Sequence, residues 1–510
     1  MKVVIYTAMF GEYDTLKDPL ITHPDVDFVY FSEKKIDHLT VWQYQKPIQD
    51  FSCPIKNNRY HKMHPHLLFA NDSYEASVYL DANIFIVDSF ICDRAIELVK
   101  NNITMALVNH PDRYCSFQEL ETVLLNKLIS TETYKKTHQF LTNNTAKNQG
   151  LFEANLIFRN HHDAAIQIFC VDWWNSFLNL CNRDQVLLPF YLTKHGICPD
   201  LFFMSPLKNT RNHPSFICMF HHQQTPKKLD ADHSILKENY MIPTIWHLPI
   251  NAVLKYHMRV YLNYNVLLDE PRTFNEHINA LKQSPPSSFQ TQLSDKLALK
   301  SVVKRMPFNI HTPKTLCIGD HLDEILDHDL PTPFMLKANH SSGDTWCISD
   351  KTNISTQLKK TINASITRPY GDATFEANYL NIPRFLFAEE CLPGPLLDFK
   401  VFVFNGQPKL IQVDIDRDTN HTRCFYDNQW VKQPYSLLKP LYNGAISKPM
   451  SLDLMLKASA HIGQHFRFVR VDFYDVDGLP YLGEVTFFPE AGFGPFSDLK
   501  YDYLLGRYFI

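Results

Sequence analysis

The chain contains 510 residues, of which 45% are hydrophobic and 13% aromatic, enough for more than one buried core. Its formal net charge of -4, without a long basic run, argues against nucleic acid and anionic membrane surfaces as partners. The 11 cysteines include no CxxC pair, which favours reduced thiols and a cytoplasmic location over a disulfide framework.

Short apolar segments alternate with helical stretches over the first 220 residues. The pattern predicts buried strands at residues 3–10, 26–32 and 77–82, and helices at residues 93–101, 117–130 and 163–180. This order indicates an α/β domain whose sheet contains parallel strands. In such sheets ligands bind beyond the carboxyl ends of the strands.

Polar features lie at the carboxyl ends of all three predicted strands. They are residues 7–13 at the first strand, residues 27–32 at the second, and Asp81 and Asn83 at the third. An Asp-x-Asn pair at a strand end supplies hard oxygen ligands for a divalent cation that bridges a diphosphate, although Asp also ends strands for structural reasons alone. Arg59 and Lys62, about one helical turn apart, are cations that could face the same phosphates.

The first half resembles glycosyltransferases of the GT-A kind in the runs TAMFGEYD, DVDFVYFSE, NNRYHKMHPHLLF, YLDANIFI and RDQVLL. The resemblance covers residues 1–222 and implies a Rossmann-like α/β domain that uses a sugar nucleotide with Mg²⁺ or Mn²⁺. The donor-binding residues that it implies are Thr7, Phe10, Gly11, Tyr13, Arg59, Lys62, Asp81 and Asn83. The implied metal ligands are Asp81, Asn83 and His221, and the implied catalytic residue is Asp184.

The alternation of strands and helices stops at residues 223–250, which carry prolines and mixed charges. This composition predicts a linker between the first domain and a second domain at residues 251–510.

Charged residues stand at the ends of predicted elements in the second half. A helix opens at residues 294–295 with an N-cap and continues from Lys296. A strand over residues 332–339 carries Lys337 among apolar neighbours and leads into a Ser/Gly loop at residues 341–343, whose N–H groups can approach a phosphate. A lysine within a strand costs burial free energy unless it is paired or bound to an anion, so Lys337 indicates either an ion pair or an anion-binding site.

Two later strands carry carboxylates. One ends in Glu389 and Glu390, and the next begins with Asp398 and Lys400 and turns at residues 405–406 into a hairpin.

A hairpin is also predicted for FVRVDFYDVDGLPYLGEVTFFPEAGFG, residues 468–494. A loop with an odd number of residues places Arg470 opposite Glu484, with Asp472 and Thr486 on the same face, whereas a two-residue loop turns Glu484 away from Asp472. The hypothesis of a site therefore predicts the odd loop. Two carboxylates on one face suit Mg²⁺ that bridges phosphates, and the arginine can hold a phosphoryl group. The alternative is an edge hairpin with solvated ion pairs.

The second half resembles the ATP-grasp superfamily, and in detail its TupA branch, in the runs PRTFNEH, SDKLALKSVV, FMLKANHSSGDT, AEECLPG, DFKVFVFNGQPKLIQV, RVDFYDVDG and YLGEVTFFPEAGF. The resemblance implies an α+β ATP-grasp domain that uses ATP and Mg²⁺. The implied ATP-binding residues are Lys296, Lys337, Ser341, Ser342, Gly343, Glu389, Glu390, Asp398 and Lys400. The implied metal ligands are Asp472, Glu484 and Thr486, and the implied catalytic residues are Arg470 and Lys337.

Together the two resemblances imply a bifunctional enzyme of surface-polysaccharide assembly, of the capsule, O-antigen or teichuronic type. The second half would activate a uronic acid or similar carboxylate with ATP and join it to an amine or amino acid, while the first half would add a sugar. Such an enzyme would be cytoplasmic and would associate transiently with membrane-bound glycan assembly machinery at the inner face of the membrane. The alternatives are an ATP-dependent phosphotransferase and a non-catalytic scaffold that binds glycans or nucleotides.

Overall fold

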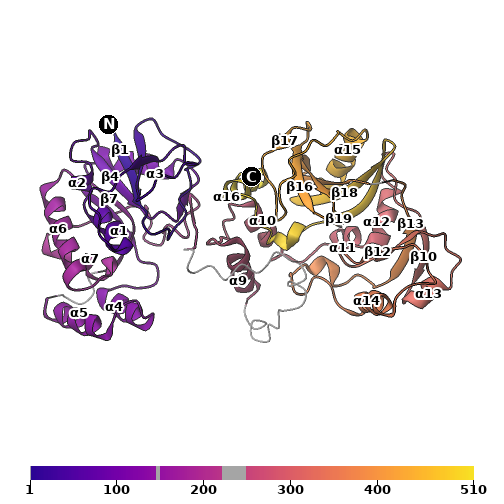
Figure 1. Cartoon of the computed structure of the whole chain (residues 1–510), viewed down its shortest axis with the longest axis horizontal. Coiled ribbons are helices and arrows are strands. Elements are labelled where there is room, and N and C mark those ends of the chain that lie inside the picture. Colours follow the sequence, from indigo (N-terminus) through magenta and orange to yellow (C-terminus); the bar gives the residue numbers. More distant parts are fainter. Residues whose placement is uncertain (1, 145–149, 221–248, 395, 418) are drawn as a thin grey trace. The chain divides into compact units, whose positions relative to one another are not determined.

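The computed structural model describes residues 2–144, 150–220, 249–394, 396–417 and 419–510. These residues form two compact units (Figure 1). The N-terminal unit contains the described residues up to 220 together with Asn263–Asn265, and the C-terminal unit contains the other described residues from 249 to 510. None of the helices in these ranges is both long and apolar enough to cross a membrane.

A mixed sheet forms the centre of the N-terminal unit. Its strands are β1 (Val3–Ala8), β2 (Val26–Phe31), β3 (Gln43–Gln45), β4 (Ala76–Leu80), β6 (Met105–Asn109), β7 (Phe152–Arg159) and β8 (Asp200–Leu201). They lie in the order β3-β2-β1-β4-β7-β6-β8. β1 is parallel to β2 and β4, whereas β7 is antiparallel to β4 and β6. The α/β arrangement with parallel strands that the sequence predicts is therefore present.

The described residues of this unit also form helices, which are α1 (Pro54–Met63), α2 (Pro65–Leu68), α3 (Phe90–Lys100), α4 (Ser116–Leu125), α5 (Thr131–Asn144), α6 (Ala164–Asn179) and α7 (Asp184–Lys194). α1 packs against β1, and α7 packs against β7. Asp163 caps α6 by accepting hydrogen bonds from two backbone N–H groups of the first turn. The helix predicted at residues 117–130 is shorter than expected, because α4 ends at Leu125.

A small antiparallel sheet completes the N-terminal unit and consists of β5 (Ile84–Ile86) and β9 (Phe216–Cys218). The chain returns to this unit after α9 (Ile250–Leu262), since Tyr264 forms a bridge with Met219 and Asn265 N donates to Cys218 O at 2.8 Å.

The C-terminal unit contains two antiparallel sheets. The four-stranded sheet has the order β10-β13-β11-β12 and the bounds β10 (Thr315–Gly319), β11 (Phe334–Ala338), β12 (Thr345–Ile348) and β13 (Leu386–Glu390). The six-stranded sheet has the order β17-β16-β15-β14-β18-β19 and the bounds β14 (Asp398–Phe404), β15 (Gln407–Ile415), β16 (Thr422–Asp427), β17 (Lys432–Gln433), β18 (Phe468–Val476) and β19 (Leu479–Thr486). β14 and β15 are joined through Asn405 and Gly406, both with positive φ, as the predicted hairpin requires.

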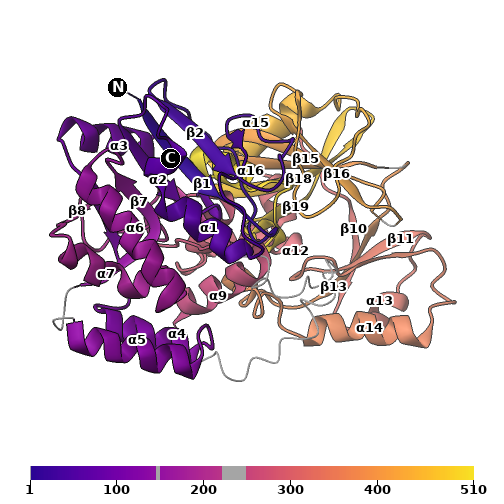
Figure 2. The ribbon, with the colours of Figure 1, turned by 60° about the vertical axis from the view of Figure 1, so that its left-hand side comes forward.

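Helices cover these two sheets. Their bounds are α10 (Phe274–Leu281), α11 (Ser288–Ser294), α12 (Lys296–Val303), α13 (Leu322–Leu326), α14 (Thr356–Thr367), α15 (Leu452–Gly463) and α16 (Leu499–Gly506), with short 3-10 turns η2 (Ala377–Tyr379), η3 (Pro489–Gly492) and η4 (Arg507–Phe509). α15 packs on β14, β15 and β18, while α11 and α12 pack on β19. Figure 2 shows α13 and α14 beside the four-stranded sheet, where their apolar residues share its core.

The hairpin of β18 and β19 differs from the predicted odd loop. Val476 pairs directly with Leu479, so the loop contains only Asp477 and Gly478, both left-handed with φ of 49° and 82°. A bulge at Gly483 then shifts the register, because Phe473 pairs with Leu482 but Asp472 pairs with Glu484.

The loop prediction was therefore wrong, yet the bulge brings Glu484 opposite Asp472. Arg470 lies opposite Thr486 and not, as predicted, opposite Glu484. The backbone at Gly483 has little room, since a Cβ there would lie 3.1 Å from Tyr474 Cε2.

Candidate functional sites

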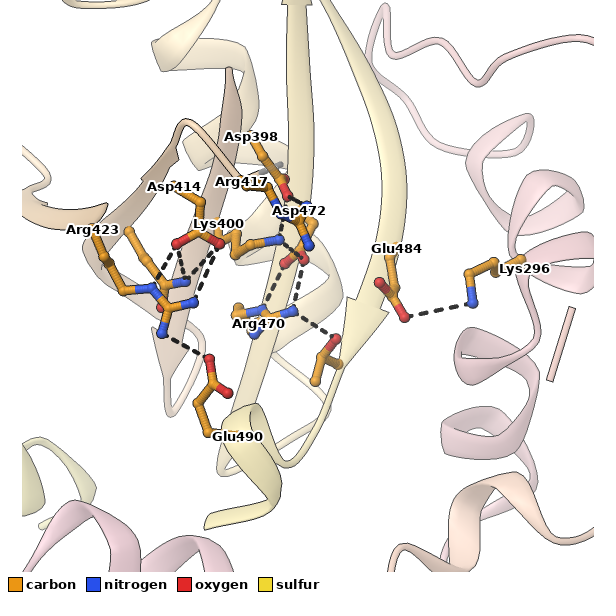
Figure 3. Close-up of polar contacts among 12 residues, drawn as sticks. Lys296, Asp398, Lys400, Asp414, Arg417, Arg423, Arg470, Asp472, Glu484 and Glu490 are labelled. Carbon is orange, nitrogen blue, oxygen red and sulfur yellow. Dashed lines mark hydrogen bonds and ion pairs between the residues drawn. The ribbon is translucent and has the colours of Figure 1, made fainter. Parts of the chain in front are cut away.

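Arg470 and Asp472 form the centre of the polar face of the six-stranded sheet (Figure 3). Arg470 Nε donates to Asp472 Oδ1 at 2.8 Å and Nη2 donates to Asp472 Oδ2 at 2.7 Å, a two-point contact between buried groups. Arg470 Nη2 also donates to Thr486 Oγ1 at 3.1 Å. The structure thus brings together three of the predicted residues, Arg470, Asp472 and Thr486.

Lys400 links this centre to Asp398. Its Nζ donates to Asp472 Oδ2 at 2.7 Å and to Asp398 Oδ2 at 2.5 Å. Arg417, which the sequence did not single out, donates from Nη1 to Asp398 Oδ2 at 2.8 Å. Cross-strand pairing of β14 with β18 places Lys400 directly opposite Asp472, which is why the contact forms.

The two carboxylates that hold Lys400 differ in their electrostatics. Burial raises the pKa of Asp398 despite the opposing charge of Lys400. Burial also acts on Asp472, but Arg470 and Lys400 hold the pKa of that carboxyl below its usual range. Asp472 therefore stays ionised where Asp398 protonates more readily.

A second cluster lines a cavity between α12 and the four-stranded sheet. Lys296, Lys300, Lys337 and Glu389 all contribute to its wall, as does the bulged Gly483. Glu389 is buried and forms ion pairs with Lys337 and, at 2.8 Å, with Lys300 Nζ. Burial lowers the pKa of Lys300 below its ordinary value, and the charge of Glu389 offsets only part of this effect. Lys300 was not among the predicted residues. Its position four residues after Lys296 places both lysines on one helix face, and this spacing could have identified it.

Lys296 connects this cavity to the hairpin. Its Nζ lies 3.6 Å from Glu484 Oε1 (Figure 3). The same Nζ donates to the backbone oxygen of Ser341 in the predicted Ser/Gly loop. Asp295 caps α12 by accepting from Leu297 N at 2.9 Å, so the helix begins with the lysine directed at the loop. The structure thus brings together Lys296, the loop and Glu484.

The remaining loop residues have other contacts. Gly343 has a φ of 83°, a conformation that suits glycine. The Ser342 side chain hydrogen-bonds with Tyr370. Glu390, predicted to act beside Glu389, lies apart from it, because successive strand residues alternate in direction. Its Oε1 accepts from Lys314 N at 2.8 Å.

A network that the sequence did not predict extends this face toward β16. Arg423 Nε donates to Asp414 Oδ1 at 2.5 Å, and its Nη1 donates to Glu490 Oε1 at 2.7 Å (Figure 3). Despite burial, hydrogen bonding by His421 and the charge of Arg423 hold the pKa of Asp414 well below its usual range. Strand alternation weakly indicates Asp414 as a face residue, but no local pattern links Arg423 to Glu490.

Four predicted residues meet in the N-terminal unit, from α1, the end of β4 and the start of α7. Lys62 Nζ lies 2.6 Å from Asp184 Oδ2 and 3.8 Å from Asp81 Oδ1, and Arg59 Nε lies 3.0 Å from Asp184 Oδ2. Although burial opposes it, Arg59 and Lys62 hold the pKa of Asp184 well below its usual range. Asp184 therefore forms ion pairs with both cations.

The other predicted residues of this unit occupy varied positions. Asn83 Nδ2 donates to Met219 O at 2.8 Å, Gly11 N donates to Glu33 Oε1 at 2.9 Å, Thr7 and Phe10 are buried, and Tyr13 is 37% exposed. His221 lies outside the described residues.

Glu153, on β7, is a buried carboxylate that was not among the predicted site residues. Its Oε1 lies 2.6 Å from Arg211 Nη2. Burial raises the pKa of Glu153 to about 7 against the charge of Arg211, and Asp81 contributes to the increase.

Residues 276–510 match the family described as TupA-like ATPgrasp. The C-terminal part of the chain therefore has the ATP-grasp fold, as predicted, while the match does not extend to residues 1–275. No curated protein matches the chain.

Several solved ligase structures are similar to parts of the chain. An L-amino acid ligase from Bacillus licheniformis has 13% identity and a TM-score of 0.30, covering 48% of this chain and 56% of that one. A D-alanine–D-alanine ligase from Bacillus anthracis complexed with ATP has 19% identity and a TM-score of 0.23, covering 38% and 55%. A phosphoribosylamine–glycine ligase from Thermotoga maritima has 14% identity and a TM-score of 0.26, covering 41% and 52%. The chain thus spans about half the length of these proteins.

Proposed function

We propose that the C-terminal unit is an ATP-dependent ligase that joins a carboxylate to an amine through an acyl phosphate. The observation that carries this proposal is the bulged register of β18 and β19, which sets Asp472 opposite Glu484 beside Arg470. The lysine-lined cavity next to Glu484 and the TupA-like ATP-grasp match support it.

The positions of the charged groups suggest separate roles. Lys296 and Lys337 border one cavity and would bind ATP phosphates, with the N–H groups of the Ser341–Gly343 loop beside Lys296. Arg470 would hold the phosphoryl group as it moves to the substrate carboxylate. Lys400 would keep Asp398 and Asp472 in place until phosphate oxygens draw its ammonium away.

Mg²⁺ fits the donor set that the hairpin presents. Asp472 is held ionised, and the Glu484 side chain is 22% exposed and lies 3.6 Å from Nζ of Lys296, which lines the cavity. No group of three or more His, Cys, Asp or Glu residues suited to a metal occurs within the described ranges. Two carboxylates nevertheless suffice for Mg²⁺, which commonly binds through one or two carboxylates together with substrate phosphates and water. The ion would neutralise charge on the transferred phosphoryl group.

The Thr486 hydroxyl accepts from Arg470, so we assign it to orienting the guanidinium more than to metal binding.

The direct test is ADP release from purified protein with ATP, Mg²⁺, a panel of uronic acids and a panel of amines. Release that requires both a carboxylate and an amine supports the ligase. Release that requires only the carboxylate indicates a phosphotransferase. No release under any combination counts against both activities and favours a non-catalytic scaffold.

We further propose that the N-terminal unit is a sugar-nucleotide-dependent glycosyltransferase of the GT-A kind. The supporting observation is the parallel pairing of β1 with β4, which brings the end of β1 near Thr7 beside Asp81. Arg59 and Lys62 would release Asp184 to meet the diphosphate, and Asp81 would bind Mg²⁺ or Mn²⁺. Binding of UDP or GDP measured by calorimetry with Mn²⁺, and its loss in Asp81→Asn, tests this proposal.

A bifunctional enzyme of surface-polysaccharide assembly would account for both units. We propose that it works in the cytoplasm near membrane-bound glycan assembly machinery. Mass spectrometry of the surface glycan with and without this protein would show a missing amide, a missing sugar, or both.

A further inference from the structure

The turn after β19 holds two non-glycine residues in the left-handed region. Glu490 has φ and ψ of 50° and 30°, Ala491 has 51° and 21°, and Gly492 follows with a φ of 66°. A left-handed backbone is unfavourable for residues with a Cβ and persists where the surroundings impose it.

Helix α10 and its C-cap residue hold the turn through three buried side chains on one helix face. Asn275 Nδ2 donates to Gly494 O at 2.9 Å and Asn279 Nδ2 donates to Gly492 O at 2.6 Å. Lys282 Nζ donates to Ala491 O at 2.6 Å. The spacing of four and three residues aligns these donors on one face. A Cβ on Gly492 would lie 2.5 Å from Asn279 Nδ2, so this close approach requires glycine.

The consequence is a fixed position for the Glu490 carboxylate. Figure 3 shows it below Arg470 and directed at Arg423, from which it accepts a hydrogen bond at 2.7 Å. Arg423 is itself anchored by Asp414 and by Leu437 O at 2.9 Å. Burial opposes the charge of Arg470, but the carboxylates of Asp472, Glu484 and Glu490 raise the pKa of its guanidinium, so Glu490 acts electrostatically on the same group.

Deprotonation of the amine substrate is the one step of the proposed reaction to which no residue has been assigned. Asp472 and Glu484 are assigned to Mg²⁺ and Arg470 to the phosphoryl group. An amine arrives largely as its ammonium ion at neutral pH, and it must lose a proton before it can attack an acyl phosphate. A carboxylate that is held rigidly near Arg470 can bind that cation and accept the proton.

We propose that Glu490 binds the ammonium group of the amine substrate and accepts its proton. This inference rests on the proposed ligase. The ammonium transfers one proton to Glu490, the freed amine attacks the acyl carbon, and the new C–N bond replaces the C–O bond to phosphate. The second N–H proton leaves with the phosphate, and Glu490 returns its own proton to water.

Hydroxylamine provides the test, because it is mostly unprotonated at neutral pH and needs no base to attack an acyl phosphate. The wild-type protein, E490Q and E490D are incubated with Mg²⁺, ATP and glucuronic or galacturonic acid, and with either hydroxylamine or one of glycine, alanine and lysine. We expect E490Q to raise the KM for the amino acid about 10- to 100-fold, the loss typical of one charge-assisted contact, while the yield of hydroxamate stays unchanged. D453N, an exposed carboxylate on α15, is the matched control and should change neither product.

The outcomes separate the inference from the function on which it rests. Hydroxamate formation lowered as much as amide formation in E490Q would overturn the role of Glu490 while leaving the ligase intact. No hydroxamate from the wild-type protein with either uronic acid would count against the proposed ligase for these substrates, and the inference would fall with it. Thermal unfolding shows whether each variant folds. If E490Q does not fold, E490D carries the test, and an unchanged KM for the amino acid in E490D would then refute the inference.

Discussion

Asp472 and Glu484 are paired across one hairpin and share a proposed role, but they differ in burial and in the number of charged groups that they contact. Asp472 is 3% exposed and accepts three charge-assisted hydrogen bonds, two from Arg470 and one from Lys400. Glu484 has a side chain that is 22% exposed and one ion pair at 3.6 Å with Lys296. Replacing either carboxylate by its amide should therefore have the same effect on catalysis and different effects on stability.

The magnitudes follow from these contacts. Asp472→Asn leaves Arg470 and Lys400 buried with less compensation, and removing one partner of a buried ion pair typically costs about 3–5 kcal/mol. Because Lys400 keeps Asp398 and Arg470 keeps Thr486, we expect about 3 kcal/mol, the lower end of that range. Glu484→Gln loses only a long, partly solvated contact, so its cost should be below about 1 kcal/mol.

Hydrogen–deuterium exchange of peptides from β14, β18 and β19 over a urea series measures the local free energy of opening. ADP release in the ligase assay, and Mg²⁺-dependent ATP binding, measure function. Both variants should lose ADP release, but only Asp472→Asn should exchange much faster. Equal stability losses would contradict the reasoning about burial. Unchanged Mg²⁺-dependent ATP binding in both variants would refute the assignment of these carboxylates to the metal.

Three further predictions concern pH, backbone strain and metal. The pKa of Glu153 is raised from 4.5 to about 7 in the folded state. Its protonated form therefore stabilises the N-terminal unit by about 3 kcal/mol below pH 4.5, and this contribution is lost as the pH rises through about 7. Urea unfolding of Glu153→Gln should lack that part of the pH dependence. Gly371→Ala would place a Cβ 2.5 Å from Glu376 O at a φ of 90° and should lower the free energy of unfolding by about 1–3 kcal/mol. Gly394→Ala, with a φ of 80° but no neighbour within 4 Å, should lower it less. Thermal unfolding compares the two variants, and the opposite order would contradict the steric argument. Removal of divalent cations with EDTA should stop ADP release and added Mg²⁺ should restore it, and release that EDTA leaves unchanged would exclude a metal-dependent reaction.

Much of the fold followed from local pattern. The buried strands β1, β2 and β4 have the mostly apolar composition of parallel strands, and Asn405-Gly406 has the left-handed preference that a tight hairpin needs. The ion pairs between elements were less accessible. Lys300 with Glu389, or Arg423 with Glu490, joins positions separated by 89 and 67 residues, and no local periodicity reports such a contact.

The hairpin shows most clearly which structural features the sequence alone does not determine. The amino-acid sequence determined that residues near 470 and 484 form adjacent strands carrying an arginine and two carboxylates, because β-branched and aromatic residues flank a turn of Asp and Gly. It could not determine their register. The loop has two residues, which by itself turns Glu484 away from Asp472, and only the bulge at Gly483 returns it to the same face.

That bulge depends on tertiary packing. Gly483 faces the Tyr474 ring and the cavity shared with Lys296 and Lys337, and its missing side chain is what lets the strand accommodate an extra residue there. Strand propensity is a property of a few neighbouring residues, whereas register is decided by what the rest of the fold places on each face of the sheet.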